Sequence, residues 1–311
     1  MIKTGTPVVS VCLITYNHVK FIKDAIESIL QQQANFYWNI IIADDCSTDG
    51  TTAIVKAYAE KYPDRIQLIT HEKNVGLHQN FIDLFTAPQS KYVAFLDGDD
   101  VWTDTLRLQK QVDFLEQHTG YAMVYGRHGL MDEAGNPKPY RRIPPYKSGY
   151  IFNDIMLCKF LPPMAAALMR NSEIQKIYKN KNEPGIDFYL IATLCKNNKV
   201  AYMNESFFCY RINAASITNS QKPFMSGLFV KNMLLFEKEY PGLVKKGIKN
   251  GKLKELYHHA EKEPGFKSFF LLLKKFRFSP LYLRQLAKSL LHTPTNNLFT
   301  KGTQTKADEP F

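Results

Sequence analysis

Val93-Ala-Phe-Leu-Asp97-Gly-Asp99-Asp100 decides the fold, because an apolar run of β-forming residues ends there in three carboxylates around one glycine. The pattern predicts a buried strand with clustered negative charge at its carboxyl end. In an extended segment Asp97 and Asp99 lie on the same side, about 6.6 Å apart along the strand. Such carboxylates repel one another unless a cation lies between them, and they suit Mg²⁺ or Mn²⁺ carrying the phosphates of a nucleotide. An acidic turn that only caps the next helix is the alternative.

Two more predicted strands end in polar residues within the first hundred positions. They are Asn39–Ala43, followed by Asp44 and Asp45, and Val8–Ile14, followed by Thr15, Tyr16 and Asn17. In open α/β sheets ligands bind beyond the carboxyl ends of the strands, so three polar ends indicate one crevice. Loop solvation and helix capping would explain each end separately, but their agreement favours a binding site.

The first 125 residues alternate between strand and helix patterns, which predicts an α/β fold with a doubly wound, mostly parallel sheet and a helical C-terminal appendage. Residues 126–150 are rich in Gly, Pro, Tyr and Arg and are expected to form a long loop over the site. Val200–Met203 and Phe207–Tyr210 are expected to be paired strands. We therefore divide the chain into a nucleotide-binding domain at 1–222, a helical basic region at 223–295 and a polar, disordered tail at 296–311. Neither GxGxxG nor GxxxxGK[ST] occurs, which argues against dinucleotide oxidoreductases and P-loop NTPases.

Composition narrows the class of protein further. The chain has 311 residues, 45% of them hydrophobic, and five cysteines without a CxxC pair, which favours a globular protein in a reducing compartment. The N-terminus lacks a signal-peptide pattern, and no apolar stretch approaches the roughly 20 residues that span a bilayer. We therefore expect a cytoplasmic protein, either free or peripheral on the inner face of the cell membrane.

The net charge of +11 is concentrated near the C-terminus. The segment Phe266–Leu291 mixes Phe and Leu with Lys and Arg and contains no acidic residue. Such a segment suits a helix in the interface of an anionic membrane, and a core-packed terminal helix with a basic outer face is the alternative. Nucleic-acid binding would also need a recognition module, and none is present, so nucleic acid is not an expected partner.

Four motifs together resemble those of family 2 glycosyltransferases with the GT-A fold. They are PVVSVCLITYNH (7–18), IIIADDCSTDGT (40–51), HEKNVG (71–76) and YVAFLDGDD (92–100). The resemblance implies an inverting, metal-dependent enzyme with Mg²⁺ or Mn²⁺. It would move a single sugar from a nucleotide-sugar, with a UDP-sugar as the expected donor, to a glycan or lipid-linked acceptor in cell-surface polysaccharide assembly. The loop 126–150 would then contact the acceptor. The QxxRW signature of processive synthases is absent, which favours single addition.

The same resemblance implies roles for individual residues around the nucleotide. The metal would be held by Asp97, Asp99 and Asp100, with Asp97 also at the nucleotide. The base, the ribose and the loop beneath the nucleotide would involve Thr15, Tyr16, Asn17, Asp45, Asn74 and Gly76, with Asp45 accepting from the ring N–H of uracil. Gln79 stands where the family often has an arginine for the diphosphate.

Two residues further along the chain complete the implied site. Asp187 matches the general base, although Ile186 replaces the Glu that usually precedes it, and capping of its own helix is the alternative role. Arg211 lies in a segment similar to YRxHxxS and would contact the diphosphate, and Asn213 replaces the His that completes the metal site in some relatives. Two rival functions remain open, a non-catalytic nucleotide-sugar-binding subunit and a basic peripheral membrane-binding protein.

Overall fold

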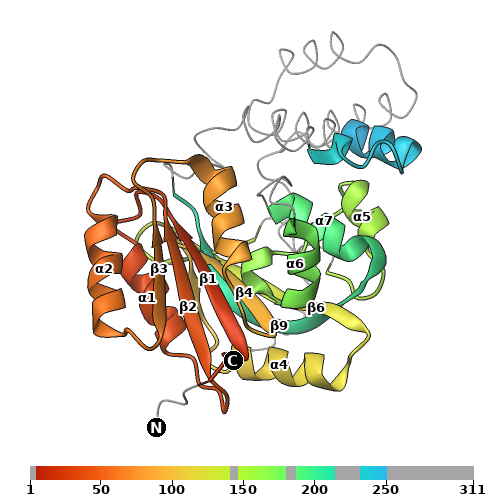
Figure 1. Cartoon of the computed structure of the whole chain (residues 1–311). Helices are drawn as coiled ribbons and strands as arrows, with labels where there is room; N and C mark the ends of the chain where they lie inside the picture. Colours follow the sequence, from red (N-terminus) through yellow and green to blue (C-terminus); the bar gives the residue numbers. More distant parts are fainter. Residues whose placement is uncertain (1–4, 141–145, 180–186, 214–231, 251–311) are drawn as a thin grey trace, which may run out of the picture. The chain divides into compact units, whose positions relative to one another are not determined.

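A computed structural model describes residues 5–140, 146–179, 187–213 and 232–250 (Figure 1). The chain divides into two compact units, Met1–Ile248 and Lys249–Phe311. In the described part of the first unit, the sheet has nine strands in the order β3-β2-β1-β4-β8-β6-β9-β5, with β7 beside β6. The predicted α/β class is confirmed.

The first half of the sheet is parallel and carries the predicted polar strand ends. Its strands are β1 (Val9–Thr15), β2 (Trp38–Asp44), β3 (Ile66–Thr70) and β4 (Tyr92–Asp97), connected through α1 (Ile22–Leu30), α2 (Thr51–Lys61) and α3 (Gly76–Thr86). The residues of β1, β2 and β4 are almost all buried, as expected for parallel strands covered by helices, whereas the edge strand β3 is partly exposed. Thr15 pairs with Asp44, and Ile14 pairs with Asp97. The three polar ends therefore meet at one edge of the sheet.

The second half of the sheet mixes both directions. Its elements are β5 (Val101–Trp102), α4 (Arg107–Gln117), β6 (Tyr121–Met131), β7 (Pro137–Lys138), α5 (Phe152–Met156), the 3₁₀ helix η1 (Met164–Ala166), β8 (Ala167–Arg170), α6 (Asn171–Tyr178), α7 (Asp187–Asn197) and β9 (Lys199–Arg211). Strand β8 is antiparallel to both β4 and β6, and β9 runs parallel to β6. The end of β9 also pairs with the short β5, directly after the acidic turn.

Two expectations about this half are wrong. Val200–Met203 and Phe207–Tyr210 do not pair with each other but lie in the single strand β9, which bends through register shifts against β6. The first residues of the predicted loop 126–150 continue β6 to Met131. A Cβ on Gly126 would lie 2.4 Å from the ring of Phe207, so this glycine permits close packing between strands.

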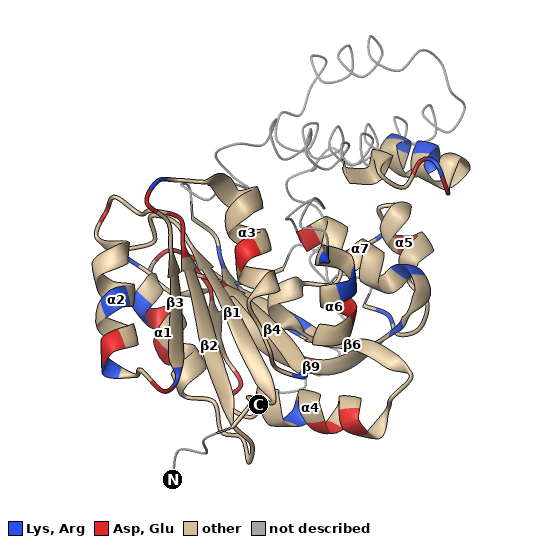
Figure 2. Ribbon diagram, in the orientation of Figure 1, with Lys and Arg blue, Asp and Glu red and all other residues tan. Residues whose placement is uncertain are grey.

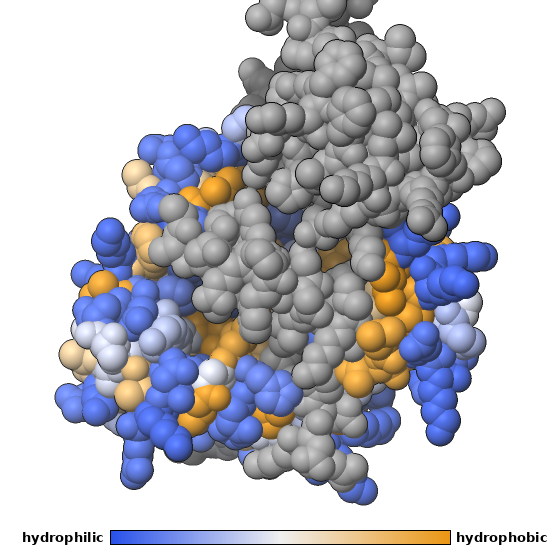
Figure 3. Space-filling model, turned by 90° about the horizontal axis from the view of Figure 1, so that it is seen from above, coloured by the Kyte–Doolittle hydropathy of each residue, from blue (hydrophilic) through white to orange (hydrophobic). Residues whose placement is uncertain are grey.

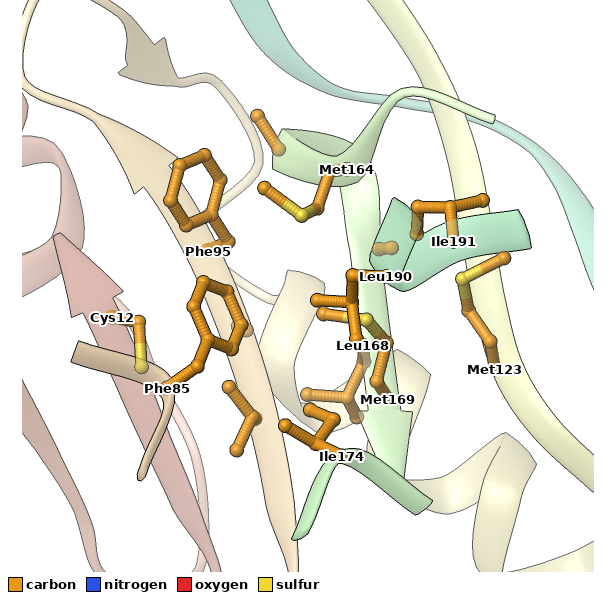
Figure 4. Packing of buried hydrophobic residues seen from close by; sticks show 14 of the residues in the cluster. Cys12, Phe85, Phe95, Met123, Met164, Leu168, Met169, Ile174, Leu190 and Ile191 are labelled. Atoms are coloured by element: carbon orange, nitrogen blue, oxygen red, sulfur yellow. The ribbon is translucent and has the colours of Figure 1, made fainter. Parts of the chain in front are cut away.

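Helices cover both faces of the sheet. Helix α3 contacts α6, and α6 contacts α7, on one face, whereas α1, α2 and α4 contact the sheet on the other (Figure 1). The rings of Phe81, Phe85 and Phe95 stack between α3 and β4, with centroids 4.4 Å apart for the first two. Figure 4 shows Phe85 and Phe95 together with Leu168 and Leu190 in this core. The middle of the sheet is almost free of charged residues (Figure 2).

Arg107 is a fully buried charged residue at the start of α4. Its guanidinium donates to the carbonyls of Ala165, at 2.5 Å, and Ala167, at 3.1 Å, and it lies over the ring of Trp102. Burial lowers its pKa well below the ordinary value. Arg107 therefore connects the segment after the acidic turn to the start of β8, because it satisfies carbonyls that would otherwise be buried without partners.

The described helices include none that is both long and apolar enough to cross a bilayer. Residues 241–250 are helical, and the rings of Phe236 and Tyr240 pack against Phe152 of α5. The segment Phe266–Leu291 lies outside the described residues, and so do residues 141–145 of the loop expected at 126–150.

Candidate active site

The acidic turn after β4 packs tightly against the end of β1. A Cβ on Gly98 would lie 2.7 Å from Nδ1 of His18 and 2.8 Å from Oγ1 of Thr15, so only glycine fits there. Thr15 and His18 are themselves 3.2 Å apart through these two atoms. The chain therefore crosses the end of β1 at Gly98, and the buried Thr15 lies beneath the turn.

The end of β9 closes over the same turn from the other side. The backbone N–H of Arg211 donates to Oδ1 of Asp100 at 2.8 Å, and its Nε donates to the carbonyl of Asp99 at 2.8 Å. Nδ2 of Asn213 donates to Oδ2 of Asp99 at 3.0 Å. The guanidinium of Arg211 also binds the carbonyl of Glu133 and lies 3.6 Å from the carboxylate of Asp24. Arg211 is only 4% exposed, and its hydrogen bonds hold the acidic turn in place.

The negative charges of the carboxyl groups in the turn repel one another, which changes their pKa values. Burial, followed by the charges of Asp99 and Asp187, raises the pKa of Asp97 well above the ordinary value. Burial and the charges of Asp97 and Asp99 likewise raise the pKa of Asp100, although the bond from Arg211 acts in the opposite direction. The charge of Asp187, the first residue of α7, is thus one of the causes that raise the pKa of Asp97.

The donor set of the turn fits a divalent cation. Oδ2 of Asp100 is buried and has no hydrogen-bond partner in the described part of the chain, and a cation would relieve the repulsion among its neighbours. No three Asp, Glu, His or Cys side chains among the described residues are arranged to hold a metal by themselves. One or two carboxylates completed by phosphate oxygens and water are a usual site for Mg²⁺. The carboxylates of Asp97, Asp99 and Asp100 are those from which such a site would be made, and an ion there would satisfy Oδ2 of Asp100.

Asp187 is the first residue of α7. Its Oδ1 accepts from the backbone N–H of Phe188, one residue further on, at 2.6 Å, whereas an N-cap side chain accepts from the second or third N–H of its helix. The residue keeps contact with solvent, yet the surrounding protein raises the pKa of its carboxyl above the ordinary value. Residues 180–186, including Ile186, lie outside the description.

Asn17 and Asp44 hold the loop that follows β2. Oδ1 of Asn17 accepts from the backbone N–H of Thr48 at 2.9 Å, and its own N–H donates to Oγ of Ser47 at 2.9 Å. Ser47 donates in turn to the fully buried Asp44, at 2.5 Å. Asn17 adopts a φ of 57°, a conformation that asparagine tolerates. The neighbouring Tyr16 is 41% exposed and leaves its ring available to a ligand.

Asp45 caps the amino end of α3. Its two carboxylate oxygens accept from the backbone N–H groups of Val75, at 2.7 Å, and Gly76, at 2.9 Å. Asn74 donates to the carbonyl of Asp45 at 3.3 Å. Gly76 has a φ of +84° and open space where a Cβ would lie. A carboxylate accepts about four hydrogen bonds, so Asp45 keeps lone pairs for a ligand.

The structure thus places Thr15, Asp45 and the acidic turn at one edge of the sheet, and it adds contacts from two residues that the sequence analysis did not assign, His18 and Asp24. Burial lowers the pKa of His18 against the opposing charge of Asp99. The only sequence signal for His18 was Gly98 itself. A glycine between two aspartates indicates that another residue lies too close for a side chain, and here that residue is His18. No sequence pattern indicated Asp24. Figure 3 views the molecule from above and shows hydrophilic residues over much of the described surface there.

The model of Glycosyl transferase family 2 matches residues 10–184, which is more than half of the chain. The chain belongs to Glycosyl transferase family 2. The match covers β1 through α6 and includes the strand ends and the acidic turn. The family resemblance inferred from the four motifs is therefore confirmed.

Several curated family 2 relatives are similar over part of their length. An uncharacterized Mycobacterium tuberculosis protein is 31% identical over 218 residues, which are 68% of this chain and 60% of that protein. The putative teichuronic acid biosynthesis glycosyltransferase TuaG of Bacillus subtilis is 38% identical over 131 residues, 42% of this chain and 50% of TuaG. The Escherichia coli UDP-Glc:alpha-D-GlcNAc-diphosphoundecaprenol beta-1,3-glucosyltransferase WfgD is 24% identical over 218 residues, 68% of this chain and 80% of WfgD. The chain thus spans 60% of the length of the mycobacterial relative.

Two solved structures share the fold of this family 2 chain. The S. aureus TarS fragment 1–349, in complex with UDP-GlcNAc, aligns with a TM-score of 0.60 at 16% identity and covers 92% of this chain and 81% of that one. The mannosyltransferase PcManGT of Pyrobaculum calidifontis, in complex with GDP-Man and Mn²⁺, gives a TM-score of 0.56 at 14% identity over 92% of this chain and 85% of that one. The predicted GT-A-like architecture is confirmed at the level of the fold.

Proposed function

We propose that the chain is an inverting, divalent-metal-dependent glycosyltransferase that moves a single sugar from a UDP-sugar to a glycan or lipid-linked acceptor in surface-polysaccharide assembly. The observation that carries the proposal is the acidic turn at Asp97–Asp100, in which a buried oxygen of Asp100 has no partner among the described residues. Family membership supports the reaction class. The names of WfgD and TuaG support the lipid-linked acceptor and the polysaccharide setting.

The chain's own residues have separate tasks in this proposal. Asp97, Asp99 and Asp100 would hold Mg²⁺ or Mn²⁺, and a bound ion of this kind offsets the charge of a diphosphate leaving group. Asp187 would accept the proton of the attacking hydroxyl, and its raised pKa brings it nearer to the working pH of a base. A base on the opposite side of the sugar from the leaving group gives inversion.

The remaining predicted residues would form the nucleotide pocket. Tyr16 offers an exposed ring, and Asp45 keeps acceptor capacity for the ring N–H of uracil. Thr15 and Asn17 shape the loops around the base and ribose, and Asn74 and Gly76 form the turn beneath it. The diphosphate contact predicted for Arg211 stays a prediction, because the contacts shown for its guanidinium are all within the protein.

A panel of nucleotide-sugars tests the proposal. Purified protein is incubated with UDP-glucose, UDP-galactose, UDP-GlcNAc and GDP-mannose, with Mn²⁺ or with EDTA, and released nucleoside diphosphate is measured. We expect release from one or more UDP-sugars with Mn²⁺ and none with EDTA. Release that is unaffected by EDTA would contradict metal dependence, and binding of a UDP-sugar without any turnover would favour the non-catalytic subunit.

A further inference from the structure

A cavity lies at the edge of the sheet opposite the candidate active site. It has a volume of about 660 Å³ and is lined by the loops that lead into β2 and β3. Its size falls within the range of about 300–1,000 Å³ that small-molecule sites occupy. Strand β2 has seven residues, so the cavity and the acidic edge lie about 20 Å apart along the strand. The cavity is thus separate from the nucleotide site.

The charged side chains that line the cavity include two of each sign, and some of them already bind other residues of the chain. Arg65 donates to the carbonyl of Trp38 at 3.0 Å and lies over the Trp38 ring at 4.2 Å. Glu27 accepts from the hydroxyl of Tyr58 at 2.5 Å. The two other charged residues of the lining, Lys61 and Asp64, have opposite signs. A lining with balanced charge gives no preference for a phosphate, a nucleotide or a metal ion, and favours a neutral ligand.

The remaining lining combines rings with free amides. Phe36 and Tyr62 are half-buried and contribute apolar surface. The side chains of Gln31 and Gln33 are exposed and make no hydrogen bond within the described residues. Amides both donate and accept, as hydroxyl groups do. A sugar presents C–H faces that pack on rings and a rim of hydroxyl groups, so it matches both parts of this lining.

We propose that this cavity is a second binding site, specific for a neutral saccharide, at the amino-terminal edge of the sheet. It would hold a distant part of a glycan while the chemistry takes place at the other edge. The site would bind sugar whether or not the chain transfers one, so its test is independent of the test of the proposed function.

Saturation-transfer NMR of the full chain tests the site with cellobiose, maltose and N,N′-diacetylchitobiose as probes. Excess UDP and Mn²⁺ are added so that sugar does not enter the nucleotide site. We expect transfer to at least one saccharide, and loss of that signal in the double variant Gln31→Ala, Gln33→Ala. The control is Gln67→Ala, Gln117→Ala, two exposed glutamines outside the cavity, which should keep the full signal.

Two results would overturn the proposal. One is the absence of transfer to every saccharide of the panel, and the other is a signal that the Gln31/Gln33 variant retains. Both glutamines are exposed, so their removal should leave the melting temperature unchanged, and a thermal scan of each variant establishes this first. Tyr62→Ala gives an independent check, since it removes a ring from the lining and should also abolish the signal.

Discussion

At the scale of single residues, the acidic turn shows how charge and packing combine. Gly98 must lack a side chain because Thr15 and His18 occupy the space that a Cβ would need, and this close contact fixes Asp97 and Asp99 on either side. Asp100 faces inward and binds the backbone of Arg211. Adjacent carboxyl groups of similar chemistry therefore have different tasks, set by their surroundings.

Asp99→Asn should abolish metal-dependent binding of UDP. The change keeps the size of the side chain but removes the charge that balances a cation, while the contact with Asn213 can still be made in a flipped orientation. Calorimetry of UDP with Mn²⁺ measures the effect. Asp113→Asn, at an exposed position on α4, is the control and should bind as the wild type does. Unchanged affinity in the Asp99 variant would contradict the metal role.

Asp187→Asn should leave binding of the donor nearly intact and reduce transfer by about 10²- to 10⁴-fold, the usual contribution of a positioned base. The amide oxygen can still accept from the backbone N–H of Phe188, so this local contact is retained. Steady-state transfer rates and UDP calorimetry on the same preparation separate the two effects. Transfer at a near wild-type rate would assign Asp187 to capping alone.

Arg107→Met should lower the free energy of unfolding by about 2–6 kcal/mol, because two buried carbonyls lose their donor at about 1–3 kcal/mol each. Packing on Trp102 is weakened as well. Urea denaturation followed by tryptophan fluorescence measures it. Arg127→Met, at an exposed position on β6, should change stability by less than about 0.5 kcal/mol. Equal effects of both substitutions would show that the buried contacts of Arg107 do not stabilise the fold.

At the scale of elements, the sequence predicted the parallel strands and their polar ends because each signal is local. An apolar β-branched run followed by Asp or Asn needs only a few neighbouring residues to be recognised. The roles of Arg107 and Arg211 could not be predicted in this way. Arg211 contacts the carbonyl of Asp99 across a sequence separation of 112, and no local pattern records that pairing. The continuity of β9 was missed because its bends interrupt the alternation on which strand prediction depends.

The pairing of β6 with β9 contains a histidine whose titration should be measurable. His128 stacks on Phe208, and burial lowers its pKa from 6.5 to about 4. The unfolded chain therefore binds a proton that the folded chain does not between these two values, and stability is lost as the pH falls from about 6.5 to about 4.

His128→Phe should remove this part of the pH dependence while it keeps the stacking. Melting temperatures at pH 7.5 and pH 5 measure it, and the fall between the two should be smaller in the variant than in the wild type. His118→Gln, at an exposed position after α4, serves as the control. An identical fall in wild type and His128 variant would show that the histidine is protonated in the fold.

At the scale of the whole molecule, the boundary at Ile248 separates the described catalytic unit from the basic C-terminal region. A chain ending at residue 250 should hydrolyse soluble donor as the full chain does, but should no longer bind vesicles containing phosphatidylserine. Each Lys or Arg near such a surface contributes about 1 kcal/mol, and salt screens that attraction. Vesicle flotation at low and high salt measures binding. If the shorter chain aggregates instead, the removed segment packs on the unit, and the alternative of a core-packed helix holds.

The hydrogen bonds between Arg211 and the acidic turn also determine when the site can form during synthesis. The turn leaves the ribosome more than a hundred residues before Arg211 and Asn213 do, at about 5–20 residues per second, and non-local pairings form late in folding. Until β9 is complete, the carboxylates of Asp100 and Asp99 lack the hydrogen bonds that Arg211 and Asn213 donate to them. A nascent chain stalled before residue 199 would therefore contain the acidic turn without these contacts. Under the proposed function, binding of UDP with Mn²⁺ should begin only when the last strand of the sheet is complete.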